Sequence, residues 1–99
     1  MAEIGTPQEY VTYSDTVLYD VFYESGTMLG GKLQACMRAA EAIGDVGAIA
    51  DFKAESIAAR QRRAAVDAYD RDEQVRVMIE FQTRRVELKT VLERLRSDG

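Results

Sequence analysis

Hydrophobic residues recur at steps of three and four between residues 14 and 43, which is the spacing of one face of an α-helix. The positions that carry this pattern are Val17, Leu18, Val21, Phe22, Met28, Leu29, Leu33, Cys36, Met37, Ala40 and Ile43. A strand over residues 17–23 is the competing interpretation, because that segment is rich in β-branched and aromatic residues. Apolar pairs four residues apart favour a helix, since a half-buried strand would alternate. We therefore predict a helix over residues 14–43, capped near Ser14 or Asp15.

A turn is predicted at residues 44–47, because Gly44 suits the left-handed conformation that ends many helices and Asp45 could cap the next one. From residue 48 to residue 98 the chain has neither glycine nor proline, and alanine, glutamate, arginine and leucine are frequent. These are strong helix formers. We therefore expect a second helix over residues 49–97, whose weakest part is the polar segment 67–74.

The two helices predict an all-α fold, an antiparallel helical hairpin whose second helix is the longer. At a rise of about 1.5 Å per residue the first helix spans ~45 Å and the second ~74 Å, so the second overhangs by about twenty residues. The overhang carries an apolar stripe, which we expect to be the partner-binding surface. The stripe consists of Met78, Phe81, Leu88, Leu92 and Leu95. The alternative is a break near residues 67–74, which would fold the chain into a three-helix bundle.

Small residues would face one another in such a hairpin and let the two backbones approach closely. The helix-packing residues expected from this register are Gly26, Gly30, Ala58 and Ala65. Tyr19 and Tyr23 lie four residues apart on one helix face, and tyrosine is favoured at interfaces, so they form a possible interface. The expected domain organisation is an irregular lead-in over residues 1–13, followed by a single helical domain over residues 14–99.

The 99 residues suffice for one domain. Thirteen basic and seventeen acidic side chains give a net charge of −4, which argues against non-specific binding to nucleic acid or to an anionic membrane. No apolar run reaches the length of about 18 residues that a membrane-spanning helix needs. Cys36 is the only cysteine, so a disulfide within the chain is excluded and a reducing, cytoplasmic location is the expectation.

Candidate chemistry is sparse. Residues 26–32 have the G-x-x-x-x-G-K spacing of a phosphate-binding loop, but Leu33 stands where Ser or Thr should hold Mg²⁺. Cys36 lacks a histidine that could act as its base. Asp67, Asp70 and Glu73 share a helix face and could approach a cation, yet they lack the histidine or glycine of known carboxylate sites. We therefore expect no catalytic residue, cofactor or metal ion.

The leading hypothesis is a non-enzymatic interaction or assembly protein, a subunit or adaptor, whose C-terminal helix binds a protein partner or a second copy in a homo-oligomer. The alternative is a small regulator that contacts nucleic acid through arginines. The arginines concerned are Arg60, Arg62, Arg63, Arg84 and Arg85.

In length and in its predicted two-helix build, the chain resembles the small helical-hairpin proteins of type VII secretion. The tryptophan-x-glycine turn of that family would fall at residues 44–47, where this chain has no tryptophan. Tyr69-Asp-Arg-Asp-Glu73 resembles the family's tyrosine-x-x-x-acid export signal, although it lies within the predicted second helix. The resemblance implies an exported helical-hairpin protein as a third hypothesis.

Overall fold

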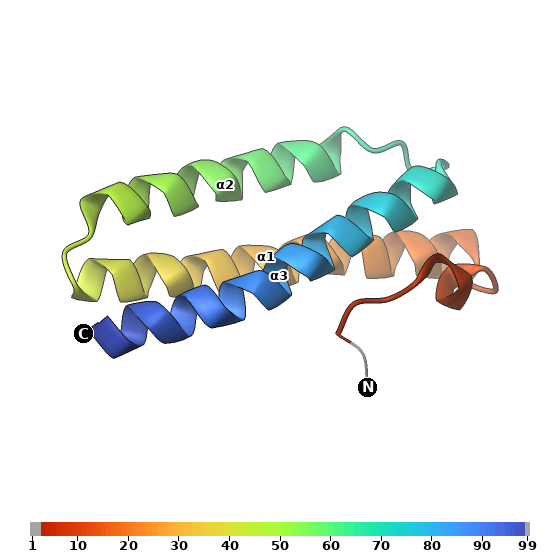
Figure 1. Cartoon of the computed structure of the whole chain (residues 1–99). Coiled ribbons are helices and arrows are strands. Elements are labelled where there is room, and N and C mark those ends of the chain that lie inside the picture. Colours follow the sequence, from red (N-terminus) through yellow and green to blue (C-terminus); the bar gives the residue numbers. More distant parts are fainter. Residues whose placement is uncertain (1–2, 99) are drawn as a thin grey trace.

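The computed structural model describes residues 3–98, which contain helices and no strand. The elements are a 3-10 helix η1 (Pro7–Tyr10) and three α-helices, α1 (Asp15–Ala42), α2 (Val46–Ala64) and α3 (Arg71–Asp98). In Figure 1, α2 returns alongside α1, and α3 then runs back across α1 in the same direction as α1. The all-α prediction is confirmed, and the architecture is the three-helix bundle that was the alternative to the hairpin. The two-helix build behind the resemblance to type VII secretion proteins is wrong.

The single long helix predicted over residues 49–97 is wrong, because the chain leaves the helical conformation between α2 and α3. The Asp67 carboxylate accepts a hydrogen bond from the backbone N–H of Tyr69 at 2.7 Å. The Asp70 carboxylate accepts one from the backbone N–H of Glu73 at 3.1 Å and so caps α3. Aspartate side chains offer the backbone partners that compete with helical hydrogen bonds. The break predicted near residues 67–74 is therefore confirmed.

The other predicted helix boundaries lie within three residues of those in the structure. The Ser14 side chain accepts a hydrogen bond from the N–H of Val17 at 3.2 Å and caps α1, so the strand interpretation of residues 17–23 is wrong. Gly44 has φ of +70°, the left-handed conformation expected of it. The Asp45 carboxylate then accepts from the N–H of Ala48 at 3.0 Å and begins α2. Together these caps produce the tight turn between α1 and α2.

The hydrophobic core lies mainly between α1 and α3. The buried apolar side chains of α1 are Leu18, Phe22, Leu29, Leu33, Cys36 and Ala40, and those of α3 are Val77, Met78, Phe81, Leu88 and Leu92. Among the described residues of α2, Phe52 alone is buried. Each large apolar side chain that leaves water contributes about 1.5–3 kcal/mol. This gain explains why the chain folds back at the polar segment.

The apolar stripe of the C-terminal helix is consequently covered within the chain. Met78, Phe81, Leu88 and Leu92 are buried, and Leu95 is partly buried against them. The expectation that the stripe is exposed is wrong, because it assumed that residues 67–74 continue the helix. Any surface that binds a partner therefore lies elsewhere on the bundle.

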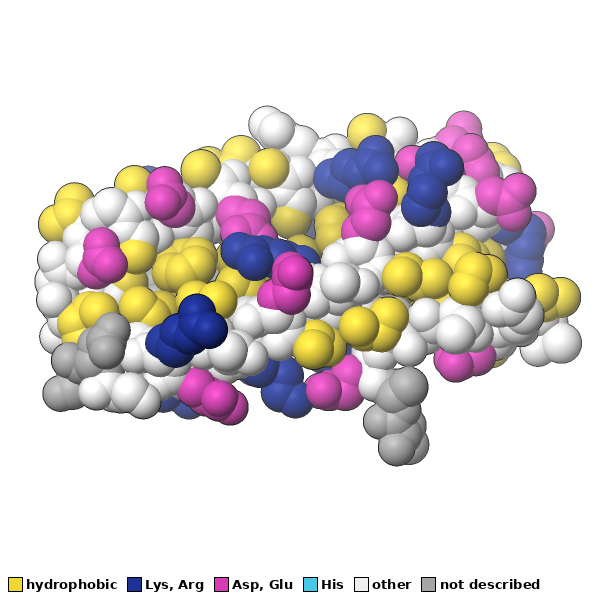
Figure 2. All heavy atoms as spheres, in the orientation of Figure 1, with side chains coloured by type: hydrophobic (Ala, Val, Ile, Leu, Met, Phe, Trp, Pro, Cys, Tyr) yellow, Lys and Arg dark blue, Asp and Glu magenta, His cyan; other side chains and the backbone are white. Residues whose placement is uncertain are grey.

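Helices α2 and α3 both pack on α1 but make little direct contact with each other. Ion pairs connect them instead: Arg62 lies 3.5 Å from Glu73 and 3.4 Å from Glu80. Arg84 donates to both carboxylate oxygens of Glu55, at 2.6 and 2.8 Å, and this hydrogen bonding raises the pKa of the Arg84 guanidinium. Figure 2 shows this face, where hydrophobic side chains gather between the helices and basic and acidic side chains adjoin.

The N-terminal lead-in packs against α3, and part of it is the 3-10 helix η1. Its Tyr10 side chain is buried. The N–H of Gly5 donates to the Gln82 side chain at 2.8 Å, and Gln82 in turn donates to the Tyr10 hydroxyl at 3.2 Å. Glu3 pairs with Lys89 at 2.7 Å. The lead-in thus adds a partial cover to one side of the bundle, while Met1, Ala2 and Gly99 lie outside the described residues.

Candidate functional site

A groove of about 450 Å³ lies between α1 and α2. It is lined by Gly26, Thr27, Gly30, Gln34, Met37, Lys53, Ser56, Ile57, Arg60 and Arg63. Gly26 and Gly30 contribute no side chain, so the surface of α1 is recessed at these positions. The apolar side chains of Met37 and Ile57 lie beside the recess. The charged residues of the lining are all basic. We call this surface the basic groove.

The glycines of the groove differ in what surrounds them. A Cβ atom added to Gly26 would lie 2.9 Å from Cδ of Arg63 and 3.3 Å from the Phe81 ring, so side chains of α2 and α3 approach α1 closely there. A Cβ atom added to Gly30 would meet nothing within 4 Å in the described part of the chain. Gly30 therefore does not serve the close helix packing expected of it; it leaves the groove open.

Ala58 and Ala65 are exposed, so the small-residue contacts expected from the hairpin register are not formed. Ala48, Ile49, Phe52 and Ala59 form the face of α2 that belongs to the core. Ala58 lies on the exposed side of α2, one residue from the core-facing Ala59, and Ala65 follows the last residue of that helix. Consecutive residues are separated by about 100° around a helix, so a shift of one residue moves a side chain off the contact face.

Arg63 is held at one end of the basic groove. Its guanidinium donates to the backbone carbonyl of Tyr23 at 2.9 Å and to the Thr27 hydroxyl at 3.0 Å. The same guanidinium lies 3.8 Å from the centre of the Tyr23 ring, a cation–π contact. Lys53 and Arg60 are exposed and form no ion pair within residues 3–98. The groove therefore presents one positioned cation and two cations available to a ligand.

Tyr19 and Tyr23, the possible interface residues, lie beside this surface on α1. Their rings are 6.2 Å apart, and Tyr19 also contacts the buried Phe22, at a ring separation of 6.1 Å. Tyr23 is 48% exposed. Its role within the chain is to support Arg63, which links the tyrosine pair to the basic groove.

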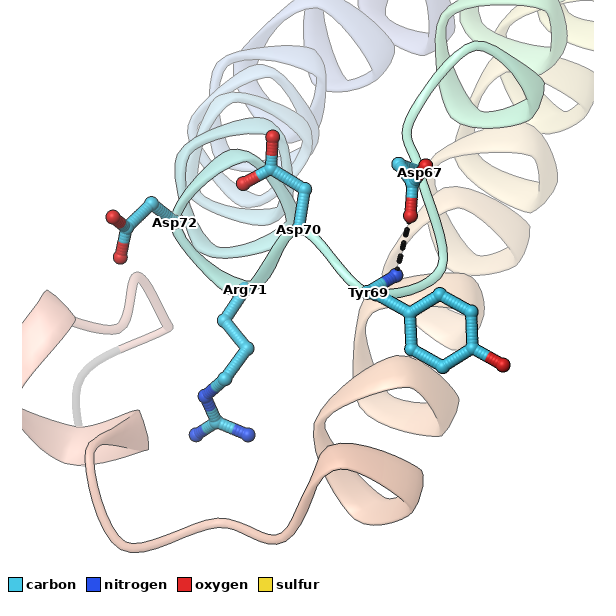
Figure 3. A pocket seen from close by; sticks show the side chains of 5 residues that line it. All are labelled: Asp67, Tyr69, Asp70, Arg71 and Asp72. Atoms are coloured by element: carbon cyan, nitrogen blue, oxygen red, sulfur yellow. Dashed lines mark hydrogen bonds between the residues drawn. The ribbon is translucent and has the colours of Figure 1, made fainter.

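A second surface lies at the end of the bundle where α2 turns into α3. The loop borders an open hollow of about 600 Å³ lined by Asp67, Tyr69, Asp70, Arg71 and Asp72 (Figure 3). Tyr69 is 88% exposed, and in Figure 3 its ring points away from the loop. On its other side a hollow of about 210 Å³ separates Tyr69 from the start of α1. We call this surface the acidic tip, which consists of Asp15, Asp20, Asp67, Tyr69, Asp70 and Asp72.

The acidic tip has a negative excess that the chain only partly neutralises. Arg71 lies within it and pairs with Asp15 at 2.7 Å while donating to the backbone carbonyls of Tyr10 and Tyr13 at 3.3 and 2.7 Å. Asp20 and Asp72 are exposed and form no ion pair in the described part of the chain. The tip is therefore an acidic surface with an aromatic side chain projecting from it.

The three carboxylates that the sequence suggested as a cation site, Asp67, Asp70 and Glu73, have partners within the protein. Asp67 and Asp70 accept backbone hydrogen bonds, and Glu73 pairs with Arg62 and Arg76. Within residues 3–98, no group of three or more Asp, Glu, Cys or His side chains is arranged to hold a metal ion.

The phosphate-loop spacing and the cysteine have structural roles. Residues 26–32 lie in the middle of α1, so their backbone N–H groups belong to the helix and do not form a phosphate-binding loop. Cys36 is fully buried, and its thiol lies 3.9 Å from the carbonyl oxygen of Leu88. Burial raises the pKa of this thiol, which disfavours the reactive thiolate.

Most of the arginines expected to contact nucleic acid are occupied within the bundle. Arg62 and Arg84 form ion pairs between α2 and α3, and Arg63 is held by Tyr23 and Thr27. Arg85 lies 3.5 Å from the sulfur of Met28. Arg60 is the member of the two clusters that contributes a free charge to the basic groove.

Comparison with protein-family models, with curated proteins and with solved structures yields no match, so function has to be inferred from the geometry. No helix in the described range is both long and apolar enough to cross a membrane. Sequence reasoning missed the basic groove because it considered Arg60 and Arg63 only as contacts to nucleic acid and did not consider Lys53. The available signal was that Lys53, Ile57 and Arg60 follow one another at helical spacing on one face.

Proposed function

We propose that this chain is a non-enzymatic helical interaction protein, and that the basic groove binds an acidic segment of a protein. The observation that supports the proposal is the charge of the lining: Lys53, Arg60 and Arg63 are its only charged residues, in a chain whose net charge is −4. The proposal keeps the function expected from the sequence, an interaction or assembly protein, but moves it from the C-terminal stripe to the groove.

The composition of the groove favours a protein segment over nucleic acid. Only two of its cations are free of internal partners, and binding of a nucleic acid depends on neutralising several phosphates at once. Met37 and Ile57 add apolar area beside the cations, which suits a segment that alternates acidic with aromatic or aliphatic side chains. We therefore expect a ligand that combines carboxylates with at least one large apolar side chain.

Fluorescence anisotropy with a labelled random copolymer of glutamate and tyrosine tests the proposal. The copolymer should bind the wild-type chain, and the double variant Lys53→Glu, Arg60→Glu should bind at least about fivefold more weakly, since each exposed charge pair contributes roughly 0.2–1 kcal/mol. Labelled polyglutamate should bind more weakly than the copolymer, because it lacks the apolar component.

The matched control is the double variant Arg94→Glu, Arg96→Glu, which makes the same charge change at exposed positions near the end of α3. It should leave copolymer binding within about twofold of wild type, because neither arginine lines the groove. Equal losses in both double variants would show that net charge alone attracts the copolymer. Tighter binding of a labelled oligothymidylate than of the copolymer would also contradict the proposal.

A further inference from the structure

We infer that the acidic segment bound by the basic groove is the acidic tip of a second copy of this chain. The inference rests on the proposed function and names its partner. It joins two surfaces of opposite charge that belong to different parts of one molecule. The contact would make this protein a self-assembling one.

The charges of the two surfaces are complementary. The tip combines five aspartates with Arg71, which already pairs with one of them, Asp15. The groove lining combines three cations with no carboxylate. The free charges are also matched in kind, since Asp20 and Asp72 on the tip and Lys53 and Arg60 on the groove have no ion-pair partner in the described part of the chain. Bringing the surfaces together would supply each group with its missing partner.

The shapes of the two surfaces are complementary as well. Tyr69 is 88% exposed on the tip and projects from the loop (Figure 3). Tyrosine is among the residues that most often serve as anchors at protein interfaces, because it offers a large apolar area with a polar end. The groove offers apolar walls at Met37 and Ile57 and an open floor at Gly30. A tyrosine ring that enters the groove would lie over Gly30, between the cations of α2 and the polar side chains of α1.

The position of the two surfaces determines the kind of assembly. The groove opens on the side of the bundle, between the middle of α1 and the C-terminal part of α2, whereas the tip lies at the end of a bundle about 45 Å long (Figure 1). One copy can therefore use its tip and its groove at the same time, on two different neighbours. Such a contact is heterologous, and it continues from copy to copy unless a ring closes. The expected product is a concentration-dependent series of oligomers and not a simple dimer.

Sedimentation velocity with the full chain and two complementary variants tests the inference. The groove variant is Lys53→Glu, Arg60→Glu, and the tip variant is Tyr69→Ser, Asp20→Lys; all four positions are exposed. Wild type should show a mass that rises with concentration at about 50 mM salt and returns to the monomer at about 500 mM, because screening weakens the charge contacts. Each variant alone should be a monomer at both salt concentrations.

An equimolar mixture of the two variants should form a dimer and nothing larger. The groove variant keeps an intact tip and the tip variant keeps an intact groove, so one contact forms and neither remaining surface can extend it. A contact at some other surface would instead persist in each variant alone, so association of either variant by itself would also contradict the inference. A monomeric wild type at low salt up to about 1 mM, or a mixture that stays monomeric, would overturn the inference.

Failure of this inference is distinguishable from failure of the proposed function. A monomeric wild type that still binds the glutamate–tyrosine copolymer through Lys53 and Arg60 would retain the groove as a binding site and exclude self-recognition. Circular dichroism at 222 nm shows whether the variants are folded. Should a charge reversal unfold the chain, the milder groove variant Lys53→Gln, Arg60→Gln and the milder tip variant Tyr69→Ser are used instead. Mixing these two variants must give the same dimer.

Discussion

Three glycines in the middle of α1 allow the packing of the bundle to be tested by one kind of substitution. Glycine inside a helix is about 1 kcal/mol less favourable than alanine. At Gly30 and Gly31, a new Cβ atom would meet nothing within 4 Å in the described part of the chain. We therefore expect Gly30→Ala and Gly31→Ala each to raise the free energy of unfolding by about 0.8–1 kcal/mol, which corresponds to a midpoint temperature roughly 4–8 °C higher for a domain of this size.

Gly26→Ala should behave differently although the residue lies in the same helix. Its Cβ atom would lie 2.9 Å from Cδ of Arg63 and 3.3 Å from the ring of the buried Phe81. The Arg63 side chain can move, but moving it weakens its hydrogen bonds to Tyr23 and Thr27. Overpacking costs about 1–3 kcal/mol. Offset by the gain in helix propensity, the result should be a net destabilisation of about 0–2 kcal/mol.

Urea unfolding monitored by circular dichroism at 222 nm measures the three changes on a common scale. The slope of the free energy against urea should stay constant, so that the midpoints report stability. Destabilisation by Gly30→Ala would refute the open floor of the basic groove. Equal stabilisation by Gly26→Ala and Gly30→Ala would refute the close approach of Arg63 and Phe81 to α1.

Substitutions at Gly30 and Gly31 also distinguish an effect on ligand binding from an effect on stability. Gly30 lines the basic groove and Gly31 does not. Gly30→Leu should therefore weaken binding of the glutamate–tyrosine copolymer, whereas Gly31→Leu should leave it unchanged, with similar stability in both variants. Unaltered binding by Gly30→Leu would show that the ligand does not enter the groove.

Three further changes test the bundle. Leu88→Ala, at a fully buried position, should lower the free energy of unfolding by about 2–5 kcal/mol. The control Thr90→Ala, at an exposed position, should change it by less than about 0.5 kcal/mol. Equal, small effects of both substitutions would contradict burial of the apolar stripe. Arg71→Ala should release the lead-in from α3 and speed proteolysis near residues 10–14, with a loss of about 1–2 kcal/mol, while the exposed Arg94→Ala should not. Burial raises the pKa of Cys36 above its ordinary value of 9.0, so the unfolded chain loses this proton first and the free energy of unfolding should fall as the pH rises past 9. Cys36→Ala should remove that part of the pH dependence. An unchanged slope of the free energy of unfolding against pH would argue against burial of the thiol.

Local features of the sequence were sufficient to predict that the chain is helical and where α1 begins and ends. Ser14, Gly44, Asp45 and Asp70 act through hydrogen bonds and backbone conformations within a few residues of themselves, so their effects can be read without knowledge of the fold. The apolar spacing of α1 likewise predicted most of its core positions, among them Leu18, Phe22, Leu29 and Leu33, whereas Val17 and Met28 of the same pattern are exposed. The weak polar segment between α2 and α3 was visible for the same reason.

Only the tertiary structure decided whether that weak segment breaks. Helix propensity of the alanines favours continuation through residues 65–70, whereas the aspartate caps favour a turn, so the local effects oppose each other. Burial of Met78, Phe81, Leu88 and Leu92 against α1 then selects the turn, because each contributes about 1.5–3 kcal/mol. The rotation of α2, which exposes Ala58 and leaves the basic groove open at Gly30, depends in the same way on long-range packing that no local pattern encodes.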